Sequence, residues 1–444
     1  MEVSPPVFLI SSGTISSILF GWFIYREYKE TSVKISPVLV LFIIPFLMLG
    51  VTSIYQGFVF FGQEYVPIGP KYTTTTSVVM GYIMVATGLF FQFLGIIFFS
   101  PKSVLKTNFL DIKSNVNLVP YFILFLLISK YLEFNFSIGV LQTFLNLVPF
   151  SILFFIAITD KKNISVSYRY KRNVVVLGSI VLFLVSLVSL SKTNNLLSIM
   201  PVFVFYLIHA KKFQKFKIFA VFGVISLTYL FFIQPLVSNA RIAFNTNKEQ
   251  VSYSEISDYI ISGNYKYSST KDMESNKYNA VEILLNRIFE IGAPAFIYDI
   301  VKTSGFQYGS TFHNMVYALV PRLIWRDKPL MTQGAKFAGK YFNQPGNNIG
   351  MLISGELYWN YGFIGIIIGS FILGLAIGFL WRLITPLAFT NFIYFTIYFY
   401  LLQSCLGGSE FTAVFMGVVQ TLVIFIIIRF LDKFFFRQTL YVFR

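Results

Sequence analysis

The densest group of charged side chains in this largely apolar chain is the string Val320-Pro-Arg-Leu-Ile-Trp-Arg-Asp-Lys-Pro329. Arg322 and Arg326 are four residues apart, so both guanidinium groups face the same way if the string forms a helical turn. Arginine binds phosphate through a planar fork of N–H donors, and Lys328 adds a compact point charge. The string therefore predicts a site for a pyrophosphate group. The alternative is a set of basic residues that contact lipid headgroups at a membrane surface.

Two residues are candidates for accepting a proton from a substrate hydroxyl. Glu356 lies in Ser354-Gly-Glu-Leu, just before an apolar segment, where a carboxylate is costly unless it is paired or functional. His313 flanks an apolar stripe and is one of two histidines in the chain. For Glu356 the alternative is an ion pair with a nearby arginine. For His313 the alternative is a half-buried structural residue.

Further cations and aromatic residues lie in the same part of the sequence. Arg287 and Arg241 are additional candidates for contact with a phosphate group. Four aromatic residues are candidates for stacking on sugar rings, although an aromatic belt at the membrane interface explains them equally well. These are Trp325, Tyr358, Trp359 and Tyr361. Asp272 and Glu274 form an Asp-x-acid pair, which we interpret as solvated loop charge, and we expect no metal or other cofactor.

The composition identifies the class of protein that carries these groups. Of 444 residues, 56% are apolar and only 12% are charged, about half the usual share in soluble domains. A single soluble core of this size cannot cover 53 Phe and 27 Tyr residues. These numbers exclude a soluble enzyme, a disordered chain and a disulfide scaffold. We therefore predict an all-α polytopic membrane protein, whose net charge of +16 does not imply nucleic-acid binding.

Apolar segments of about 20 residues predict the transmembrane helices. The eleven candidate segments are 7–25, 35–55, 77–99, 118–132, 138–159, 174–190, 196–210, 218–236, 361–381, 388–405 and 411–428. The connections on one side hold 20 Lys and Arg residues, and the short connections on the other side hold two. The positive-inside rule then predicts an extracytoplasmic N-terminus and a cytoplasmic C-terminus.

The same alternation of basic and non-basic connections divides the chain into three predicted parts. Residues 1–236 form a bundle of eight spans, and residues 356–444 form three spans and a cytoplasmic tail. Residues 237–355 form a large extracytoplasmic loop, and a loop of this length is usually functional. Apolar stripes within it predict short amphipathic helices, with Pro294 in the first turn of one and Pro321 ending another.

Four stretches of this region resemble the O-antigen polymerases, also called oligosaccharide repeat-unit polymerases or Wzy proteins. They are Asn286-Arg-Ile-Phe-Glu290, Tyr308-Gly-Ser-Thr311, the string 320–329, and Ser354-Gly-Glu-Leu-Tyr-Trp-Asn-Tyr-Gly362. The stretches lie within residues 286–365, and the long late outward loop also fits the family. The resemblance implies a fold like that of the C-type (GT-C) lipid-linked glycosyltransferases.

The resemblance also implies a reaction in the plasma (inner) membrane. A growing glycan is transferred from polyprenyl (undecaprenyl) pyrophosphate to the distal sugar of another lipid-linked repeat unit, at the outer face. Besides these oligosaccharides and membrane lipids, a chain-length regulator protein is an expected partner. An O-antigen ligase, which transfers a finished glycan to a different acceptor, is the nearest alternative. A transporter or flippase of the lipid-linked glycan is less favoured, because charge is concentrated in one outer loop and no internal repeat is evident.

Overall fold

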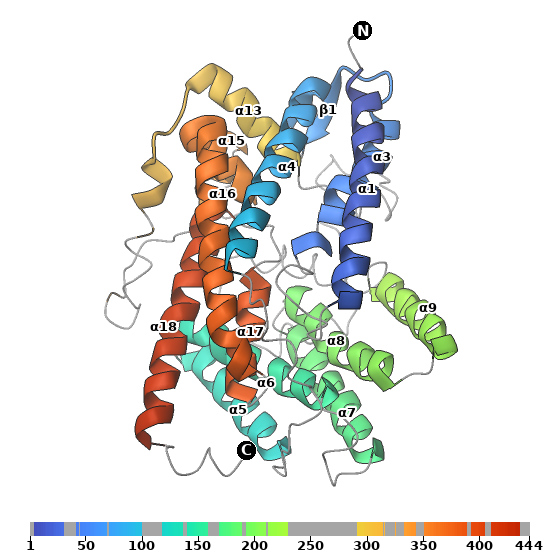
Figure 1. Ribbon diagram of the computed structural model, residues 1–444, viewed down its shortest axis with the longest axis vertical. Coiled ribbons are helices and arrows are strands. Elements are labelled where there is room, and N and C mark those ends of the chain that lie inside the picture. Colours follow the sequence, from blue (N-terminus) through green and yellow to red (C-terminus); the bar gives the residue numbers. More distant parts are fainter. Residues whose placement is uncertain are drawn as a thin grey trace, which may run out of the picture. The chain divides into compact units, whose positions relative to one another are not determined.

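A computed structural model shows a largely helical chain (Figure 1). The chain divides into two compact units. Unit 1 comprises Met1–Asn108, Phe134–Phe144 and Leu285–Arg444, and unit 2 comprises Phe109–Glu133 and Leu145–Leu284. The structure describes residues 4–30, 41–43, 45–68, 71–99, 118–135, 140–158, 168–188, 192–209, 212–229, 291–313, 315, 325, 333–342, 350–388, 392–404 and 410–435. The two units interleave along the sequence, and the expected division into residues 1–236, 237–355 and 356–444 stays a prediction.

Unit 1 contains the longest apolar helices, which are α1 (Pro5–Glu30), α4 (Thr75–Phe98), α16 (Leu352–Ala388) and α18 (Phe411–Phe435). It also contains η1 (Phe46–Val51), which continues into α3 (Thr52–Val59), and α17 (Phe392–Ser404). Between α3 and α4 the strands β1 (Tyr65–Ile68) and β2 (Lys71–Thr74) form an antiparallel hairpin, with Tyr65 opposite Thr74. Shorter elements complete it: α13 (Gly292–Ser304), η5 (Ser310–Phe312) and α15 (Gln333–Phe342).

Unit 2 is built from five helices of the described residues. They are α5 (Val119–Asn135), α6 (Val140–Ile158), α7 (Tyr168–Val188), α8 (Lys192–His209) and α9 (Lys212–Thr228), although the end of α5 and the start of α6 belong to unit 1. Helices α7 and α8 pack against each other along their length. Tyr168 at the start of α7 stacks on Phe205 of α8, with ring centroids 5.4 Å apart.

The prediction of an all-α membrane protein is confirmed. Within the described residues, six helices are long and apolar enough to cross a membrane, and four shorter apolar helices accompany them. Each of the eleven predicted segments overlaps a helix, and two agree closely: 77–99 with α4 and 411–428 with α18. The short hairpin was not predicted. Pro294 does lie in the first turn of a helix, α13, as expected, whereas the stripe that ends at Pro321 falls mostly outside the described residues.

Glycines bring the backbones of α4 and α16 into direct contact. A β-carbon built on Gly374 would lie 2.1 Å from the carbonyl oxygen of Gln92 and 3.0 Å from the α-carbon of Gly95. One built on Gly378, a turn further along α16, would lie 2.6 Å from the carbonyl oxygen of Ile96. Membrane helices lack a hydrophobic driving force for association, so small residues at four-residue spacing stabilise them by allowing such close contact. This contact makes α4 and α16 the frame of unit 1.

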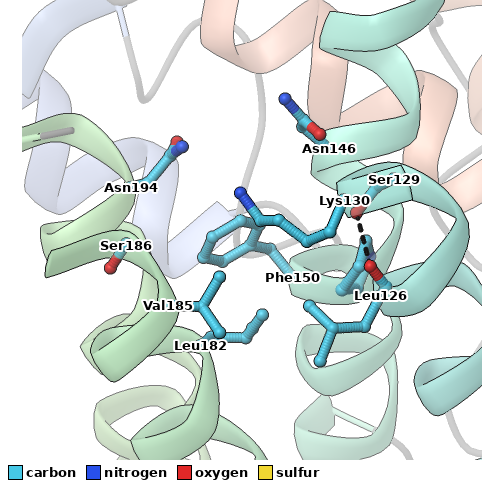
Figure 2. Close-up of a pocket in the computed structure, with 10 residues that line it drawn as sticks. Leu126, Ser129, Lys130, Asn146, Phe150, Leu182, Val185, Ser186 and Asn194 are labelled. Atoms are coloured by element: carbon cyan, nitrogen blue, oxygen red, sulfur yellow. Dashed lines mark hydrogen bonds between the residues drawn. The ribbon is translucent and has the colours of Figure 1, made fainter. Parts of the chain in front are cut away.

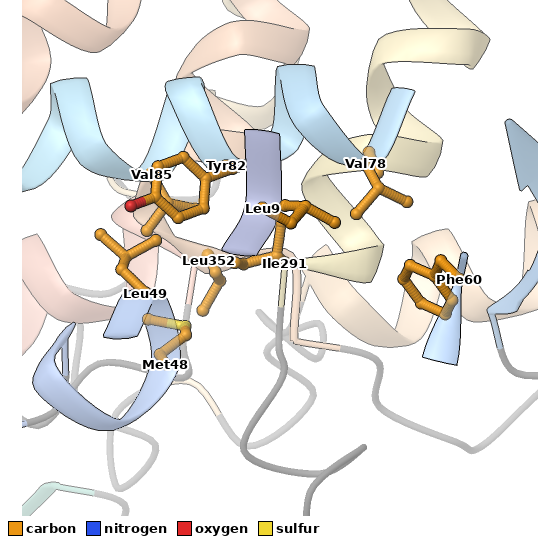
Figure 3. Packing of buried hydrophobic residues seen from close by; sticks show 10 residues of the cluster. Leu9, Met48, Leu49, Phe60, Val78, Tyr82, Val85, Ile291 and Leu352 are labelled. Carbon is orange, nitrogen blue, oxygen red and sulfur yellow. The ribbon is translucent and has the colours of Figure 1, made fainter. Parts of the chain in front are cut away.

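The other elements of unit 1 are fixed to this frame by apolar packing and by one carboxylate. Figure 3 shows the apolar cluster, in which side chains from α1, η1, α4 and α13 surround Leu352 at the start of α16. Asp299 of α13 accepts hydrogen bonds from the hydroxyls of Thr73 and Ser77, the latter over 2.5 Å. A negative charge at the start of α4 is favourable, because the unpaired N–H groups of a helix N-terminus are partly positive. Helix α13 is thereby anchored to the first turn of α4.

A methyl group added at the α4–α16 contact should destabilise unit 1. Gly374→Ala forces the two backbones apart, and overpacking of this kind costs about 1–3 kcal/mol. We expect a lower thermal unfolding midpoint for the detergent-solubilised protein. Gly223→Ala in α9 is the matched control, because a β-carbon there has no neighbour within 4 Å. Equal midpoints for the two variants would contradict direct backbone packing.

Candidate functional site

Helix α16 is broken just after its first segment. Tyr361 and Gly362 leave helical geometry, with φ −140° and ψ 19° at Tyr361 and φ 64° and ψ −150° at Gly362. A positive φ of this size favours glycine, which has no β-carbon to clash. The predicted span began at 361, which coincides with this break, but α16 itself begins at Leu352. Residues 352–360 are therefore a separate helical segment, and Glu356 lies on it.

The break folds the first segment of α16 back onto the second. A β-carbon built on Gly369 would lie 2.3 Å from the side chain of Leu357, and one on Gly365 would lie 2.5 Å from the Leu357 carbonyl oxygen. In a straight helix Leu357 and Gly369, twelve positions apart, would be separated by about 18 Å along the axis. The two segments thus form a sharp corner, in which Leu357 packs against the backbone of Gly365 and Gly369.

Glu356 is fully buried at this corner and binds the start of α18. Its Oε2 accepts a hydrogen bond of 2.9 Å from the backbone N–H of Thr412, and its Oε1 accepts one from the Thr412 hydroxyl. N–H groups in the first turn of a helix have no partner within that helix. The carboxylate of Glu356 therefore caps α18 from another helix, and its charge is favourable at that N-terminus.

A second carboxylate is buried close to the first. Glu410, which directly precedes α18, is 2% exposed, and its Oε1 accepts a long hydrogen bond of 3.4 Å from the backbone N–H of Gly334. Within the described part of the chain, no basic side chain lies within ion-pair distance of Glu356 or Glu410. The arginines of the loop lie outside the described residues, so the expected alternative for Glu356, an ion pair with one of them, stays a prediction.

Asn360 joins the corner to the preceding loop. Its side-chain N–H group donates 2.8 Å hydrogen bonds to the Thr311 hydroxyl and to the Glu356 carbonyl, while its Oδ1 accepts one of 2.9 Å from the backbone N–H of Gly309. Backbone bonds from Gln307 to the Trp359 carbonyl and from Tyr308 to the Asn360 carbonyl continue the contact. Residues 307–311 are thereby clamped onto the first segment of α16.

Loss of the Asn360 amide should loosen this clamp. Asn360→Leu keeps the approximate side-chain volume but leaves buried or half-buried groups of Gly309 and Thr311 without their partner, at a cost of about 1–3 kcal/mol each. We expect a lower unfolding midpoint and faster proteolysis between residues 305 and 313. Ser310→Ala is the control, since Ser310 is exposed and its hydroxyl donates to the side chain of Gln307, not to the first segment of α16. Unchanged proteolysis in Asn360→Leu would show that the clamp does not depend on this side chain.

The second proton-acceptor candidate, His313, is exposed at the surface beside the clamp. It follows η5, and its Nδ1 lies 3.2 Å from the carbonyl oxygen of Ser310. The alternative of a half-buried structural histidine is therefore wrong. His313 is two residues from Thr311, which the Asn360 amide holds. The clamp thus holds the backbone segment that carries the His313 imidazole.

The predicted sugar-stacking residues occupy different environments. Trp325 is 37% exposed, but Tyr358 and Trp359 are buried at 8% and 6%. The ring of Trp359 packs against Phe337 and Tyr341 of α15, with centroids 5.5 and 5.9 Å away. In this conformation Tyr358 and Trp359 are core residues, because neighbouring aromatic side chains cover their rings. Stacking of these two rings on a sugar is therefore not supported.

An aromatic residue without an assigned role is open to solvent at the same place. Tyr308 is 74% exposed and has a positive φ of 46°, which is uncommon for a bulky side chain. The neighbouring Tyr361, at the break in α16, is 47% exposed. These two rings are better placed for contact with a sugar than Tyr358 or Trp359. The Tyr308 stretch was recognised as part of a motif, but the exposure of its ring was not predicted.

The five predicted phosphate-binding cations fall outside the described residues. They are Arg322, Arg326, Lys328, Arg287 and Arg241. Asp272 and Glu274 also lie outside them. Among the residues that are described, no group of three or more His, Cys, Asp or Glu side chains has an arrangement that could hold a metal ion.

Two residues of the site carried no functional assignment from sequence reasoning. Asn360 lies within a recognised stretch, and a buried amide in an apolar helix could have indicated a hydrogen-bonding role. Thr412 gave no signal, because its contact with Glu356 joins positions 56 residues apart. Comparisons of the chain with protein-family models, with curated proteins and with solved structures found no match.

Proposed function

We propose that this protein is a membrane glycosyltransferase that polymerises oligosaccharide repeat units of a surface polysaccharide, such as O-antigen. It transfers the growing glycan from polyprenyl pyrophosphate to the distal sugar of a new lipid-linked repeat unit. The proposal includes eleven spans, an extracytoplasmic N-terminus, a cytoplasmic C-terminus, and a GT-C-like fold in the plasma membrane. Support for this topology comes from the apolar helices together with the one-sided distribution of basic residues among the connections.

One observation carries the proposal. Two of the stretches that resemble the polymerase family, residues 308–311 and 354–362, are joined directly through the Asn360 amide. The two stretches are far apart in sequence, and nothing in the composition of a membrane bundle requires them to meet. Their contact supports a common site, at which His313, Tyr308 and Tyr361 are exposed. The string 320–329 lies between these stretches in the chain, which is consistent with its cations serving the same site.

The proposed reaction assigns a role to each kind of group. The acceptor hydroxyl forms a bond to the anomeric carbon, and the bond from that carbon to the pyrophosphate oxygen breaks, leaving its electron pair on the pyrophosphate. Arg322 and Arg326, with Lys328, Arg287 and Arg241, stabilise the negative charge that develops there. His313 accepts the hydroxyl proton. Glu356 is fully buried, so we assign it a positioning role at the corner of α16 instead of contact with substrate.

Removal of the central cation should stop chain growth. Arg322→Ala is expected to lower the polymerisation rate by at least about 100-fold, the usual cost of losing one group that stabilises developing charge. Single lipid-linked repeat units should accumulate in vesicles that contain the purified protein and its substrate. Lys336→Ala is the matched control, because Lys336 is an exposed basic residue of the same long connection, on α15. Normal chain length in Arg322→Ala would remove Arg322 from the site.

Substitutions of the two proton-acceptor candidates should differ in their effects on the unfolding midpoint and on the polymerisation rate. His313→Ala should lower the rate about 100-fold without changing the unfolding midpoint, since the ring is exposed and its one described hydrogen-bonding contact is the Ser310 carbonyl. Glu356→Gln should lower the unfolding midpoint, because an amide cannot accept hydrogen bonds from Thr412 at both positions. A wild-type rate in His313→Ala would assign proton transfer to another group.

A transporter of the lipid-linked glycan is the second candidate function. A broken helix with buried carboxylates near it, as at Gly362 with Glu356 and Glu410, is also typical of secondary transporters. Such transporters usually consist of two related halves, and this sequence contains no evident repeat. A ligase remains the alternative within the same reaction class. Reconstituted vesicles distinguish them: only a polymerase lengthens repeat units that are already on the outer leaflet, without another acceptor.

A further inference from the structure

Two exposed tyrosine residues meet where residues 307–311 contact α16. Tyr361 lies at the break in α16, and a β-carbon built on Gly309 would lie 2.5 Å from its hydroxyl oxygen. Gly309 directly follows Tyr308 and has a φ of 84°, a conformation that favours glycine. Glycine at this position therefore does two things. It allows the turn, and it leaves room for the Tyr361 ring against the backbone next to Tyr308.

Uncharged polar groups accompany these rings. The Ser310 hydroxyl donates a 3.2 Å hydrogen bond to Oε1 of Gln307, at an exposed position. Among the described residues, the Gln307 amide nitrogen and the hydroxyls of Tyr308 and Tyr361 have no hydrogen-bond partner. Tyrosine combines an apolar ring face with a polar tip, and an amide offers both a donor and an acceptor. A sugar has apolar C–H faces and a rim of hydroxyls, which match these groups, whereas none of the four side chains offers a charge to a pyrophosphate.

A cavity in unit 2 is too small to be a second place for a sugar. Figure 2 shows this cavity between α5, α6, α7 and α8, with Lys130 and Asn194 among the side chains around it. Its space is about 20 Å³, room for about one water molecule. Lys130 and Asn194 also have interactions within the chain. The exposed rings of Tyr308 and Tyr361 are therefore the better surface for a sugar.

The proton acceptor of the proposed reaction is carried by the same segment as Tyr308. The Nδ1 of His313 lies 3.2 Å from the Ser310 carbonyl oxygen. A carbonyl oxygen can only accept a hydrogen bond, so a neutral imidazole in this contact has its proton on Nδ1 and its lone pair on Nε2. Nε2 is then the atom that takes a proton from a hydroxyl. A sugar held on Tyr308 is thus bound by the segment that also supplies the base.

The two substrates of the proposed reaction need different contacts. The donor reacts at the anomeric carbon next to its pyrophosphate, so contacts with the pyrophosphate also position the reacting atom. The acceptor reacts at its distal sugar, which is the end farthest from its own lipid and pyrophosphate. Contacts with that sugar itself must therefore align its hydroxyl with the donor.

We propose that Tyr308 and Tyr361 form the binding surface for the distal sugar of the acceptor, and that Gly309 positions Tyr361 within it. This inference rests on the proposed polymerisation, because it assigns the two substrates of that reaction to two places. The rings stack on the apolar face of the sugar, the neighbouring amide and hydroxyl groups bind its hydroxyls, and His313 accepts the proton of the attacking hydroxyl. The donor pyrophosphate is bound by the cations of the string 320–329.

Binding of a lipid-free acceptor to the full-length protein in nanodiscs tests this surface. Mild acid hydrolyses the bond between the anomeric carbon and the phosphate, so the repeat-unit glycan released from its lipid can serve only as an acceptor. In titrations followed by saturation-transfer NMR, Tyr308→Leu should bind this glycan about tenfold more weakly than wild type, because the stacking face is lost. Tyr308→Phe, which keeps the ring, should bind it as wild type does. Tyr65→Leu, at another exposed tyrosine, is the matched control. Equal affinity in Tyr308→Leu and wild type, or no binding by wild type, would overturn the proposal.

A second variant tests the position of the Tyr361 ring. The β-carbon of Gly309→Ala would collide with the Tyr361 hydroxyl and displace the ring, so glycan binding should weaken by a similar factor. Tyr361→Phe removes that oxygen, and the next ring atom would be 3.4 Å from the β-carbon, an ordinary contact. The double variant Gly309→Ala/Tyr361→Phe should therefore regain binding, which a general loss of structure at residue 309 would not allow. Wild-type affinity in Gly309→Ala alone would remove Tyr361 from the surface and overturn the two-ring arrangement.

Turnover distinguishes an acceptor surface from a donor surface. With the lipid-free glycan in saturating excess, the KM for the lipid-linked repeat unit should be the same in Tyr308→Leu and wild type, because its pyrophosphate binds elsewhere. A raised donor KM with unchanged glycan binding would assign the surface to the donor and overturn the proposal. Failure of the proposed function has a different result: a wild type that binds the glycan through Tyr308 but lengthens no lipid-linked repeat unit would contradict polymerisation and leave the sugar-binding surface in place.

Discussion

The corner at Gly362 depends on polar groups that are satisfied inside an apolar bundle. Burying an amide or a carboxylate without a partner costs several kcal/mol, and more where no water can replace the lost bonds. Asn360 and Glu356 are both fully buried, and the described hydrogen bonds use the oxygen and nitrogen of the former and both oxygens of the latter. Because few other arrangements satisfy all these groups at once, the bonds specify where α18 begins and where residues 307–311 lie.

Close backbone packing makes this arrangement rigid. The hydrogen bonds of Asn360 and Glu356 orient these side chains, but they require a rigid backbone frame around them. Gly374 and Gly378 supply it by allowing α16 to contact the backbone of α4, and Gly365 and Gly369 allow the first segment of α16 to fold against the second. The same helix thus uses glycine for two purposes. One set of glycines brings a neighbouring helix close, and the other allows the corner next to Glu356 to form.

Sequence reasoning identified the apolar helices well, because hydropathy is a property of each segment alone. The segments 77–99 and 411–428 match α4 and α18 closely for that reason. The first segment of α16 was missed because Leu352–Asn360 contains polar residues that resemble a loop before a span. The burial of Trp359 was also not predictable, since Phe337 and Tyr341, which cover it, lie in a short helix with two lysines. Contacts between distant segments determine such features, and no local pattern encodes them.

Two residues in strained backbone conformations mark the ends of the clamp. Tyr308 and Leu352 have positive φ values of 46° and 57°, which cost a non-glycine residue about 1–3 kcal/mol each. Leu352 is held there by the apolar cluster around it, so packing accounts for its conformation. Tyr308 is much less packed, because its side chain is 74% exposed with the ring of Phe306 6.1 Å away, and its backbone N–H donates a hydrogen bond to the Asn360 carbonyl. Strain that stability does not require is typical of functional sites. The exposed ring of Tyr308, and not the buried Trp359, is therefore the aromatic surface at which we expect a sugar to bind.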